Sequence, residues 1–235
     1  MTEIDLPLID ISQFAGVESE GDGFQYHPEV AKVREACKEW GFFRVVNHGI
    51  PPDLLQKVES VSRDLLSMPV EVKDRVTTSN PLQSYARSPD QDFFCLEDMP
   101  NPDLLQKLAQ KIWPEEGNPE FCEAIGRYSS LLSDLAAKIT KIIIASLGLD
   151  ANKFYKSDFE KCQATLHIHG YSSHAKCTGD EALQSHSDAG GVTILYNDET
   201  EGLQVRSKQG KWFNVNPKPG SFIVNLGDCF KVWSN

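Results

Sequence analysis

The fold is decided by residues 202–226, whose sequence is GLQVRSKQGKWFNVNPKPGSFIVNL. Three short runs rich in apolar residues, at 202–206, 211–215 and 221–226, are separated here by two turns that contain glycine. Short strands joined by turns are typical of an antiparallel sandwich or jelly roll, and not of a parallel sheet with helices between its strands. We therefore predict a β-rich region here.

The predicted β-rich region extends upstream to about residue 161, because residues 164–171 and 191–196 are also strand-like runs. Before it the apolar residues recur at helical spacing, and we predict helices over Glu29–Trp40 and Asp53–Ser67. A third and longest helix opens at Asn118-Pro119 and ends at Gly148.

Two strands and a loop complete the N-terminal part. We predict strands at Leu6–Ile11 and Phe42–Val46, and loop with short elements over residues 79–114, which are rich in Pro, Asn, Asp and Gln. Helices followed by many short strands indicate an α+β fold with a helical support. The expected division is an N-terminal helical and strand region over 1–120, and the supporting helix with the jelly roll over 121–235.

The composition excludes several classes of protein. The chain has 235 residues and a formal net charge of −11, which argues against nucleic acid as a partner. No apolar stretch is long enough for a membrane span, and the N-terminus has no signal-peptide pattern. Six cysteines form no C-x-x-C pair, so a zinc ribbon or thioredoxin motif has no support. We expect a cytoplasmic monomer that acts on a small molecule and binds neither nucleic acid nor membrane.

His186-Ser187-Asp188 is the motif that points to chemistry. On an extended strand alternate side chains share a face, so His186 and Asp188 would project together. One imidazole nitrogen and one carboxylate oxygen are ligands of the iron(II) site built from two histidines and a carboxylate, which leaves positions open for co-substrate and oxygen. The tripeptide alone is common by chance, so the surrounding sequence has to decide whether it binds a metal.

The context resembles the plant 2-oxoglutarate- and Fe(II)-dependent dioxygenases, the family similar to isopenicillin N synthase. Gly190-Gly191 and a buried-strand run follow the motif, and Pro219 to Asp228 and Trp233-Ser234-Asn235 come in the family's order. Trp40-Gly41-Phe42-Phe43 through Asn47-His48-Gly49-Ile50 resembles its N-terminal signature. The resemblance implies a double-stranded β-helix (jelly roll) fold, with Fe(II), 2-oxoglutarate as co-substrate, O2, and ascorbate as reductant.

The resemblance also implies roles for single residues. His186 and Asp188 match the first two iron ligands, and Tyr171 matches the tyrosine that contacts 2-oxoglutarate. His167 and His169 share the predicted face of Tyr171, where many members of the family have Arg and Asn. No residue is predicted as a catalytic acid, base or nucleophile.

Other polar residues are assigned to the scaffold or the surface. His48 is interpreted as a capping or packing histidine, and His27 and His174 as solvated loop residues. Asn225 and Asp228 resemble residues of the barrel scaffold near the site.

The chain departs from the family at its end. No histidine follows Asp188, and the family's later arginine and serine, which bind the far carboxylate of 2-oxoglutarate, are also missing. We therefore expect a truncated gene product, an incomplete gene model or a fragment. Its barrel would be incomplete at the C-terminus, with an exposed sheet edge, and its turnover poor. Replacement of the missing ligand by His167 or His169 is an open alternative.

The predicted function is hydroxylation or oxidation of a small plant metabolite. Ile112-Trp113-Pro114 and Phe121-Cys122 resemble the branch that contains auxin-oxidising and glucosinolate side-chain enzymes. Two alternatives stay open: a non-catalytic, partner-binding remnant of such an enzyme, and a cupin-type metal-binding jelly roll with other chemistry.

Overall fold

A computed structural model describes residues 2–16, 27–78, 83–171, 183–198 and 200–234. The chain forms two compact units, each assembled from separate segments. Unit 1 comprises Met1–Gly49, Asp134–Cys162 and Ser187–Asn235, and unit 2 comprises Ile50–Ser133 and Gln163–His186. The expected division at residue 120 stays a prediction.

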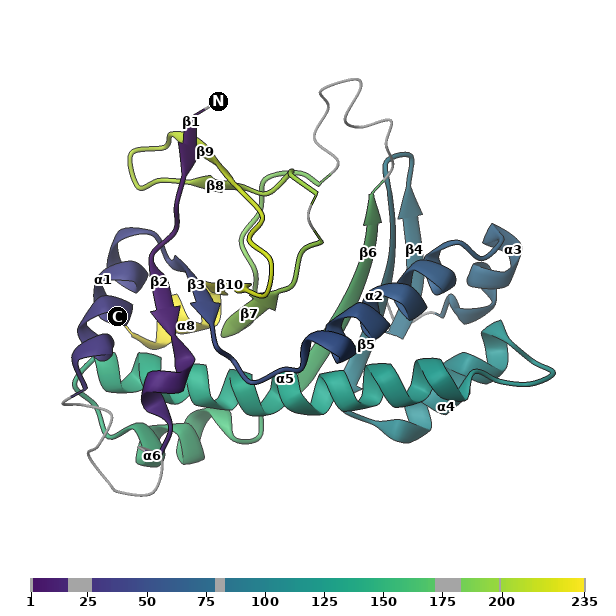
Figure 1. The fold of residues 1–235 in the computed structure, drawn as a ribbon, viewed down its shortest axis with the longest axis horizontal. Coiled ribbons are helices and arrows are strands. Elements are labelled where there is room, and N and C mark those ends of the chain that lie inside the picture. The colour runs from purple at the N-terminus through teal and green to yellow at the C-terminus, as the bar shows by residue number, and fades with distance from the viewer. Residues whose placement is uncertain (1, 17–26, 79–82, 172–182, 199, 235) are drawn as a thin grey trace. The chain divides into compact units, whose positions relative to one another are not determined.

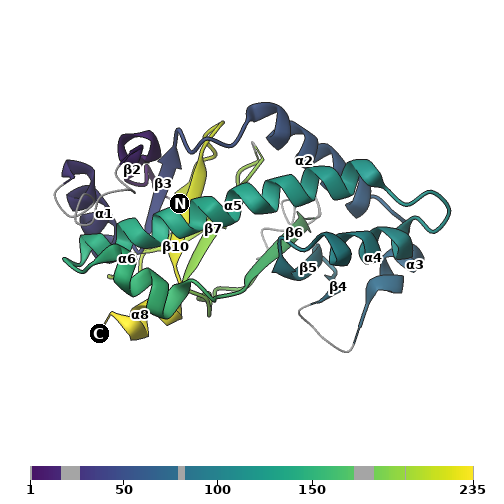
Figure 2. The ribbon, with the colours of Figure 1, turned by 90° about the horizontal axis from the view of Figure 1, so that it is seen from below.

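Unit 1 contains a four-stranded sheet with the order β2-β3-β10-β7 (Figures 1 and 2). Its strands are β2 (Leu8–Asp10), β3 (Phe42–Val46), β10 (Phe222–Leu226) and β7 (Val192–Leu195). β2 runs parallel to β3, whereas β10 is antiparallel to both of its neighbours. Segments far apart in the sequence therefore meet in one sheet.

A second sheet of unit 1 packs on the first. Its order is β1-β9-β8, with β1 (Thr2–Ile4), β9 (Trp212–Val215) and β8 (Gln204–Arg206). Val205 and Val215 from this sheet form a buried cluster with Ile223 of β10. The side chains of two sheets thus share one core, as in a β-sandwich. The strands predicted between 164 and 226 are confirmed, and those of the described residues form separate sheets without closing into a barrel.

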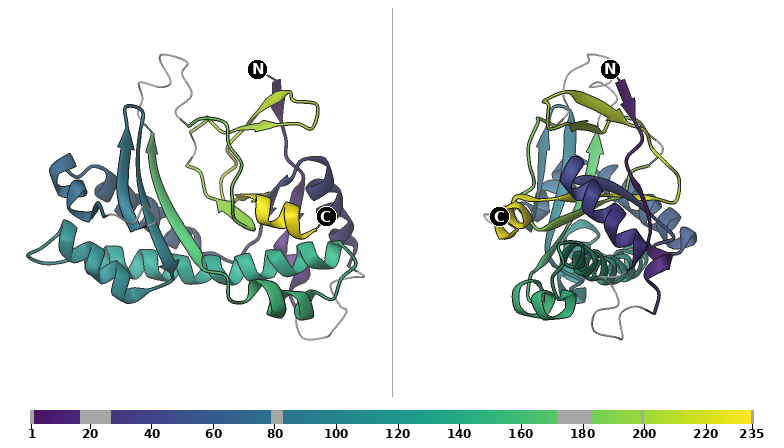
Figure 3. Two further views of the ribbon diagram at one scale, coloured as in Figure 1. Left: turned by 180° about the vertical axis from the view of Figure 1, so that it is seen from behind. Right: turned by 90° about the vertical axis from the view of Figure 1, so that its left-hand side faces the viewer.

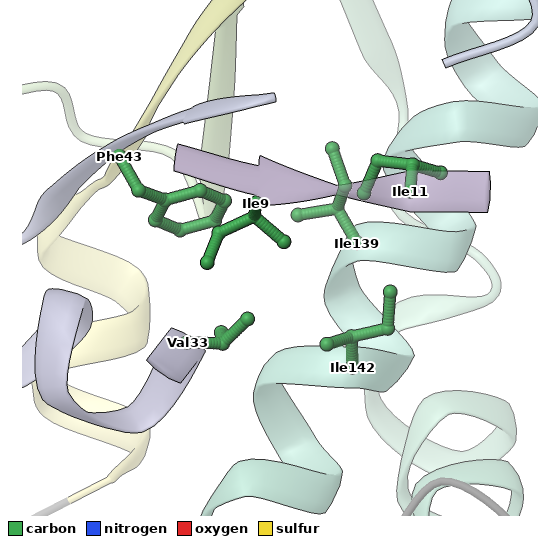
Figure 4. Close-up of a pocket in the computed structure, with 6 residues that line it drawn as sticks. All are labelled: Ile9, Ile11, Val33, Phe43, Ile139 and Ile142. Atoms are coloured by element: carbon green, nitrogen blue, oxygen red, sulfur yellow. The ribbon is translucent and has the colours of Figure 1, made fainter. Parts of the chain in front are cut away.

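The helices of unit 1 support these sheets. They are η1 (Ile11–Phe14), α1 (Pro28–Glu39), the later part of α5 (Pro119–Ser146), α6 (Ala151–Phe154), the π-helical turn η4 (Tyr155–Phe159) and α8 (Asp228–Trp233). Figure 4 shows Ile139 and Ile142 of α5 facing the same small space as Ile9 of β2 and Phe43 of β3. The six side chains around this space are all apolar, so it belongs to the core and is no ligand site. The predicted support by the long helix is confirmed.

Unit 2 contains the sheet β4-β5-β6, whose neighbouring strands are antiparallel (Figure 3, the adjacent blue and green arrows). The strands are β4 (Gln83–Ser88), β5 (Gln91–Met99) and β6 (Ala164–Tyr171). Helices α2 (Pro52–Leu66), α3 (Val70–Lys73), η3 (Asp74–Val76), α4 (Pro102–Ile112) and the first part of α5 complete the unit. No helix among the described residues is long and apolar enough to cross a membrane.

The prediction of loop with short elements over residues 79–114 underestimates the regular structure of this segment. This segment supplies β4 and β5, which form the sheet with β6, and the 11-residue helix α4. Asn101 caps α4 by accepting the backbone N–H of Leu104 at 3.3 Å. Leu105, Leu108, Ala109 and Ile112 are buried at helical spacing. The many polar residues of α4 lie on its other face and hid this pattern.

Candidate metal and co-substrate site

Asp188 is held by two strands of unit 1. Its Oδ2 atom accepts a hydrogen bond from Oγ1 of Thr193 at 2.5 Å and another from Nδ2 of Asn225 at 2.7 Å. Thr193 on β7 and Asn225 on β10 are partners in the register of the sheet. Two donors on neighbouring strands therefore converge on one oxygen and fix the orientation of the carboxylate.

The backbone around Asp188 is tied to the start of α8. The carbonyl of Asp188 accepts the N–H of Asp228 at 2.8 Å, and the carbonyl of Gly191 accepts the N–H of Gly227 at 2.9 Å. Oγ of Ser187 donates to Oδ2 of Asp228 at 2.7 Å. The scaffold role assigned to Asp228 is thereby confirmed.

Gly227 is required by the close approach of two backbone segments. A Cβ atom at this position would lie 2.1 Å from the carbonyl oxygen of Gly190 and 2.7 Å from that of Asp188. Real atoms do not pack so closely, and neither carbonyl can move without moving the segment that carries Asp188. Only glycine lets β10 lead into α8 at this distance.

His186 is held by a hydrogen bond to a residue close to it in the sequence of unit 2. Its Nδ1 atom lies 2.8 Å from the carbonyl oxygen of Gln184. Because a carbonyl only accepts, Nδ1 carries the proton, and Nε2 of a neutral ring then has the lone pair that a metal needs. A backbone carbonyl on the second nitrogen is the usual partner of a metal-binding histidine.

The strand that the sequence predicted for this motif is absent. His186, Ser187 and Asp188 precede β7 in irregular backbone, so the alternation of a strand does not explain how their side chains are directed. Only one residue separates His186 from Asp188, which limits their Cα atoms to about 7 Å. Convergence of the two side chains on one metal stays a prediction.

His167, His169 and Tyr171 share one face of β6 in unit 2, as predicted. The ring centroids of His167 and His169 are 5.6 Å apart, and those of His169 and Tyr171 are 6.0 Å apart, with planes only 6° from parallel. Phe93 of β5 stacks on His169 from the neighbouring strand at 5.6 Å and 20°. Tyr171 is 53% exposed, so its ring is held by stacking and not by enclosure.

Burial lowers the pKa of His169 to about 4, and the charges of His167 and His186 add to this effect. The ring is therefore neutral at pH 7. Nε2 of His167 lies 3.2 Å from Sγ of Cys95, which is buried and whose thiol pKa burial raises. Cys95 is thus a protonated packing residue on the same face.

The remaining histidines have structural roles or lie outside the description. His48 stacks edge-on against Phe222 at 4.5 Å, and its Nε2 lies 3.2 Å from the carbonyl oxygen of Gly220, so the packing interpretation is confirmed. The solvated interpretation of His27 is wrong, because its Nδ1 caps α1 by accepting the N–H of Glu29 at 3.2 Å. His174 lies outside the described residues.

The chemistry of these residues fits an iron site in part. In a neutral His186 ring the proton on Nδ1 leaves Nε2 for a metal, and Asp188 is a carboxylate already held by Thr193 and Asn225. Within the part of the chain that the structure describes, no group of three His, Cys, Asp or Glu side chains is arranged to hold a metal ion. His186 and Asp188 stay the two candidate ligands, and replacement of the missing third ligand by His167 or His169 stays an open alternative.

Comparison with known proteins places the chain among oxygenases. Residues 6–116 match the N-terminal family of the non-haem dioxygenase in morphine synthesis, and residues 159–235 match the 2OG-Fe(II) oxygenase superfamily. 1-Aminocyclopropane-1-carboxylate oxidase 5 of Arabidopsis thaliana is 33% identical over 98% of this chain and 74% of its own length. The chain belongs to the 2OG-Fe(II) oxygenase superfamily.

Further relatives narrow the branch of this oxygenase. Jasmonate-induced oxygenase 2 of Arabidopsis thaliana is 34% identical over the whole chain, which spans 64% of that relative's length. The dioxygenase for auxin oxidation 1 of Arabidopsis thaliana, solved with 2-oxoglutarate, is 28% identical with a TM-score of 0.81, covering 97% of this chain and 82% of that one. The family, its double-stranded β-helix fold and the auxin-oxidising branch are confirmed, and the cupin alternative is wrong.

Fe(II) and 2-oxoglutarate are the cofactor and co-substrate of this superfamily, with O2 as oxidant and ascorbate as a typical reductant. Two of the residues that suggested the branch pack against each other: Phe121 is fully buried, and its ring centroid lies 5.5 Å from that of Trp113.

Sequence reasoning missed how Asp188 is held: it assigned Asn225 only to the scaffold near the site and gave Thr193 no role. Thr193 is a polar residue within the strand Val-Thr-Ile-Leu, and Asn225 interrupts the apolar strand that begins at Phe222. A polar side chain in a buried strand has to find a partner. That requirement was the available signal, and it predicts a shared acceptor once the two strands are known to pair.

Proposed function

We propose that this chain is part of a 2-oxoglutarate- and Fe(II)-dependent oxygenase that oxidises a small plant metabolite. His186 and Asp188 are its proposed iron ligands, and Tyr171 is the proposed contact to 2-oxoglutarate. The observation that carries the proposal is the pair of donors on Oδ2 of Asp188, from Thr193 and Asn225. A half-buried asparagine and threonine on neighbouring strands, both donating to one carboxylate, are the support that a metal ligand needs.

Bound Fe(II) with 2-oxoglutarate and O2 supplies the oxidising power that no amino-acid side chain has. The protein's own residues would hold and orient the metal and the co-substrate. Asp188 presents a carboxylate that cannot rotate freely, because two donors hold Oδ2. His186 presents Nε2, because the Gln184 carbonyl holds the proton of Nδ1. Tyr171 presents a phenol from a ring that stacking keeps in plane.

The proposed substrate class follows from the relatives. Proteins named for jasmonate induction, for oxidation of 1-aminocyclopropane-1-carboxylate and for auxin oxidation are all similar to this chain. A small carboxylic acid of plant origin is therefore the proposed substrate. A monomeric state and a cytoplasmic location are part of the same proposal.

Metal binding tests the proposal most directly. We would titrate the chain of residues 1–235 with Mn(II), as a stable substitute for Fe(II), and follow the free ion by electron paramagnetic resonance. His186→Asn and Asp188→Asn should each weaken binding at least tenfold, because each removes a ligand. Undiminished binding by His186→Asn would contradict the assignment.

Two matched controls exist in unit 1. His27→Asn removes an imidazole and Asp150→Asn removes a carboxylate, but asparagine can still cap α1 and α6 at these positions. Both variants should bind Mn(II) as the parent does. Succinate formation with Fe(II), ascorbate and 2-oxoglutarate then distinguishes an enzyme from the alternative of a non-catalytic, partner-binding remnant.

A further inference from the structure

Gln91 and His169 form a side-chain pair across β5 and β6 in unit 2. Gln91 is only 8% exposed, and its Nε2 atom lies 2.5 Å from Nδ1 of His169. An amide nitrogen donates and does not accept, so Nδ1 of His169 is the acceptor. A neutral imidazole has a single N–H group, which must then be on Nε2.

The surroundings of His169 favour the neutral ring. The rings of Phe93 and Tyr171 stack on it, with 20° and 6° between the ring planes. Burial lowers its pKa to about 4, with smaller contributions from His167 and His186. A ring that stays neutral and has one nitrogen occupied by a donor can offer only one polar function, the N–H of Nε2.

We propose that Gln91 is a positioning residue, which fixes His169 as a neutral Nε2–H donor on the face of β6 that carries Tyr171. The ligand that such a donor recognises is an oxygen acceptor, here a carboxylate or keto oxygen of 2-oxoglutarate. This part rests on the proposed function of Tyr171. The tautomer itself rests only on the contact between Gln91 and His169.

The consequence is a contact that does not depend on charge. A protonated histidine would present two donors and a positive charge, and the other neutral tautomer would present a lone pair that repels a carboxylate. With Gln91 in place, His169 donates one hydrogen bond at every pH at which the protein is folded and the ring neutral. The buried amide of Gln91 on β5 thus determines that His169 presents a hydrogen-bond donor on this face of β6.

The tautomer is measured by NMR on the chain of residues 1–235 with 15N-labelled histidine, without metal or co-substrate. His169→Asn assigns the signals, because it removes them. In the parent, long-range 1H–15N correlations should identify Nδ1 of His169 as unprotonated and Nε2 as protonated. Gln91→Glu should move the proton to Nδ1 or charge the ring, because a carboxylate only accepts.

Gln91→Met supplies a second, uncharged variant of similar size. It should give a mixture of tautomers, and it decides the question if Gln91→Glu does not fold. Gln204→Glu is the matched control, since Gln204 also donates to a side chain, Asn214, but on β8 of unit 1. A parent ring with the proton on Nδ1, or a variant at Gln91 that leaves the proton on Nε2, would overturn the proposal.

Co-substrate binding is measured separately, by calorimetric titration of the Mn(II)-loaded chain with 2-oxoglutarate. Gln91→Glu should weaken binding about tenfold, the loss expected for one hydrogen bond, while Gln204→Glu should not. Unchanged affinity despite a moved proton would overturn the recognition role of His169. If the parent chain fails to bind 2-oxoglutarate, the proposed function fails, and the NMR result still decides the role of Gln91.

Discussion

Asp188 in unit 1 and Tyr171 in unit 2 are held by contacts of different kinds. Two hydrogen bonds from β7 and β10 reach a single oxygen of Asp188, and its backbone is tied to α8. Tyr171 lies half exposed at the end of a series of stacked rings, Phe93, His169 and Tyr171. A carboxylate away from water is stable in its charged form only when hydrogen-bond donors contact it, whereas an aromatic ring is held by stacking on another ring. Removal of a single polar atom should therefore cost more stability around Asp188 in unit 1 than around Tyr171 in unit 2.

The strongest test of this difference is Gly227→Ala. The new methyl group would overlap the backbone carbonyls of Gly190 and Asp188, which no side-chain movement can relieve. We expect a loss of about 3 kcal/mol in the free energy of unfolding, at the upper end of the cost of overpacking. Chemical denaturation followed by circular dichroism measures it.

Gly202→Ala is the control for this substitution. Within the described chain, a Cβ atom on Gly202 meets nothing within 4 Å, and its φ is not in the left-handed region. Its stability should stay within about 0.5 kcal/mol of the parent. Equal stability of the two variants would mean that the backbone near Asp188 yields easily, and the proposed rigidity of this carboxylate would be wrong.

The next test removes the donors one at a time. Asn225→Leu and Thr193→Val keep the approximate size of the side chain but delete a hydrogen bond to Oδ2 of Asp188. Each should cost about 1–2 kcal/mol of stability, because a partner of a charged group is lost. Each should also weaken Mn(II) binding about tenfold, as expected when a metal ligand loses a hydrogen bond that orients it.

Asn214→Leu is the matched control, because this amide accepts from Gln204 in an exposed pair. It should change neither quantity. Parent-like Mn(II) affinity in both Asn225→Leu and Thr193→Val would show that these donors serve only the fold of the sheet.

The sequence predicted the strands of unit 1 better than the elements of unit 2, for a physical reason. Strand β10 is an example: Phe222, Ile223 and Val224 are buried on both faces of the sheet and read as a continuous apolar run. Helix α4 is amphipathic and opens with Asn-Pro-Asp, so its composition indicated a loop. The candidate ligands came from a motif, whereas their supports depend on the pairing of β7 with β10 and of β5 with β6. Such pairing joins residues far apart in the chain and is invisible to local patterns.

Because His169 is buried in the neutral form, the free energy of unfolding should fall in acid. Its pKa is about 4 in the folded protein against an ordinary 6.5, so the unfolded chain takes up a proton between these values and the folded chain does not. The stability that the neutral ring contributes is therefore complete above pH 6.5 and is lost as the pH falls towards 4. Denaturant midpoints at pH 7 and pH 5 should differ less in His169→Asn than in the parent. An unchanged difference in His169→Asn would contradict the role of its burial.

The smallest effect on stability is expected for Tyr171→Phe. The ring keeps its stacking on His169, and the lost hydroxyl belongs to a side chain that is 53% exposed, so the free energy of unfolding should change by less than about 0.5 kcal/mol. The affinity for 2-oxoglutarate, measured by calorimetry on the Mn(II)-loaded chain, should nevertheless fall about fivefold to tenfold if the hydroxyl contacts the co-substrate. An affinity equal to the parent's in Tyr171→Phe would leave the stacked ring as scaffold alone, and the co-substrate contact on β6 would then have to come from His169.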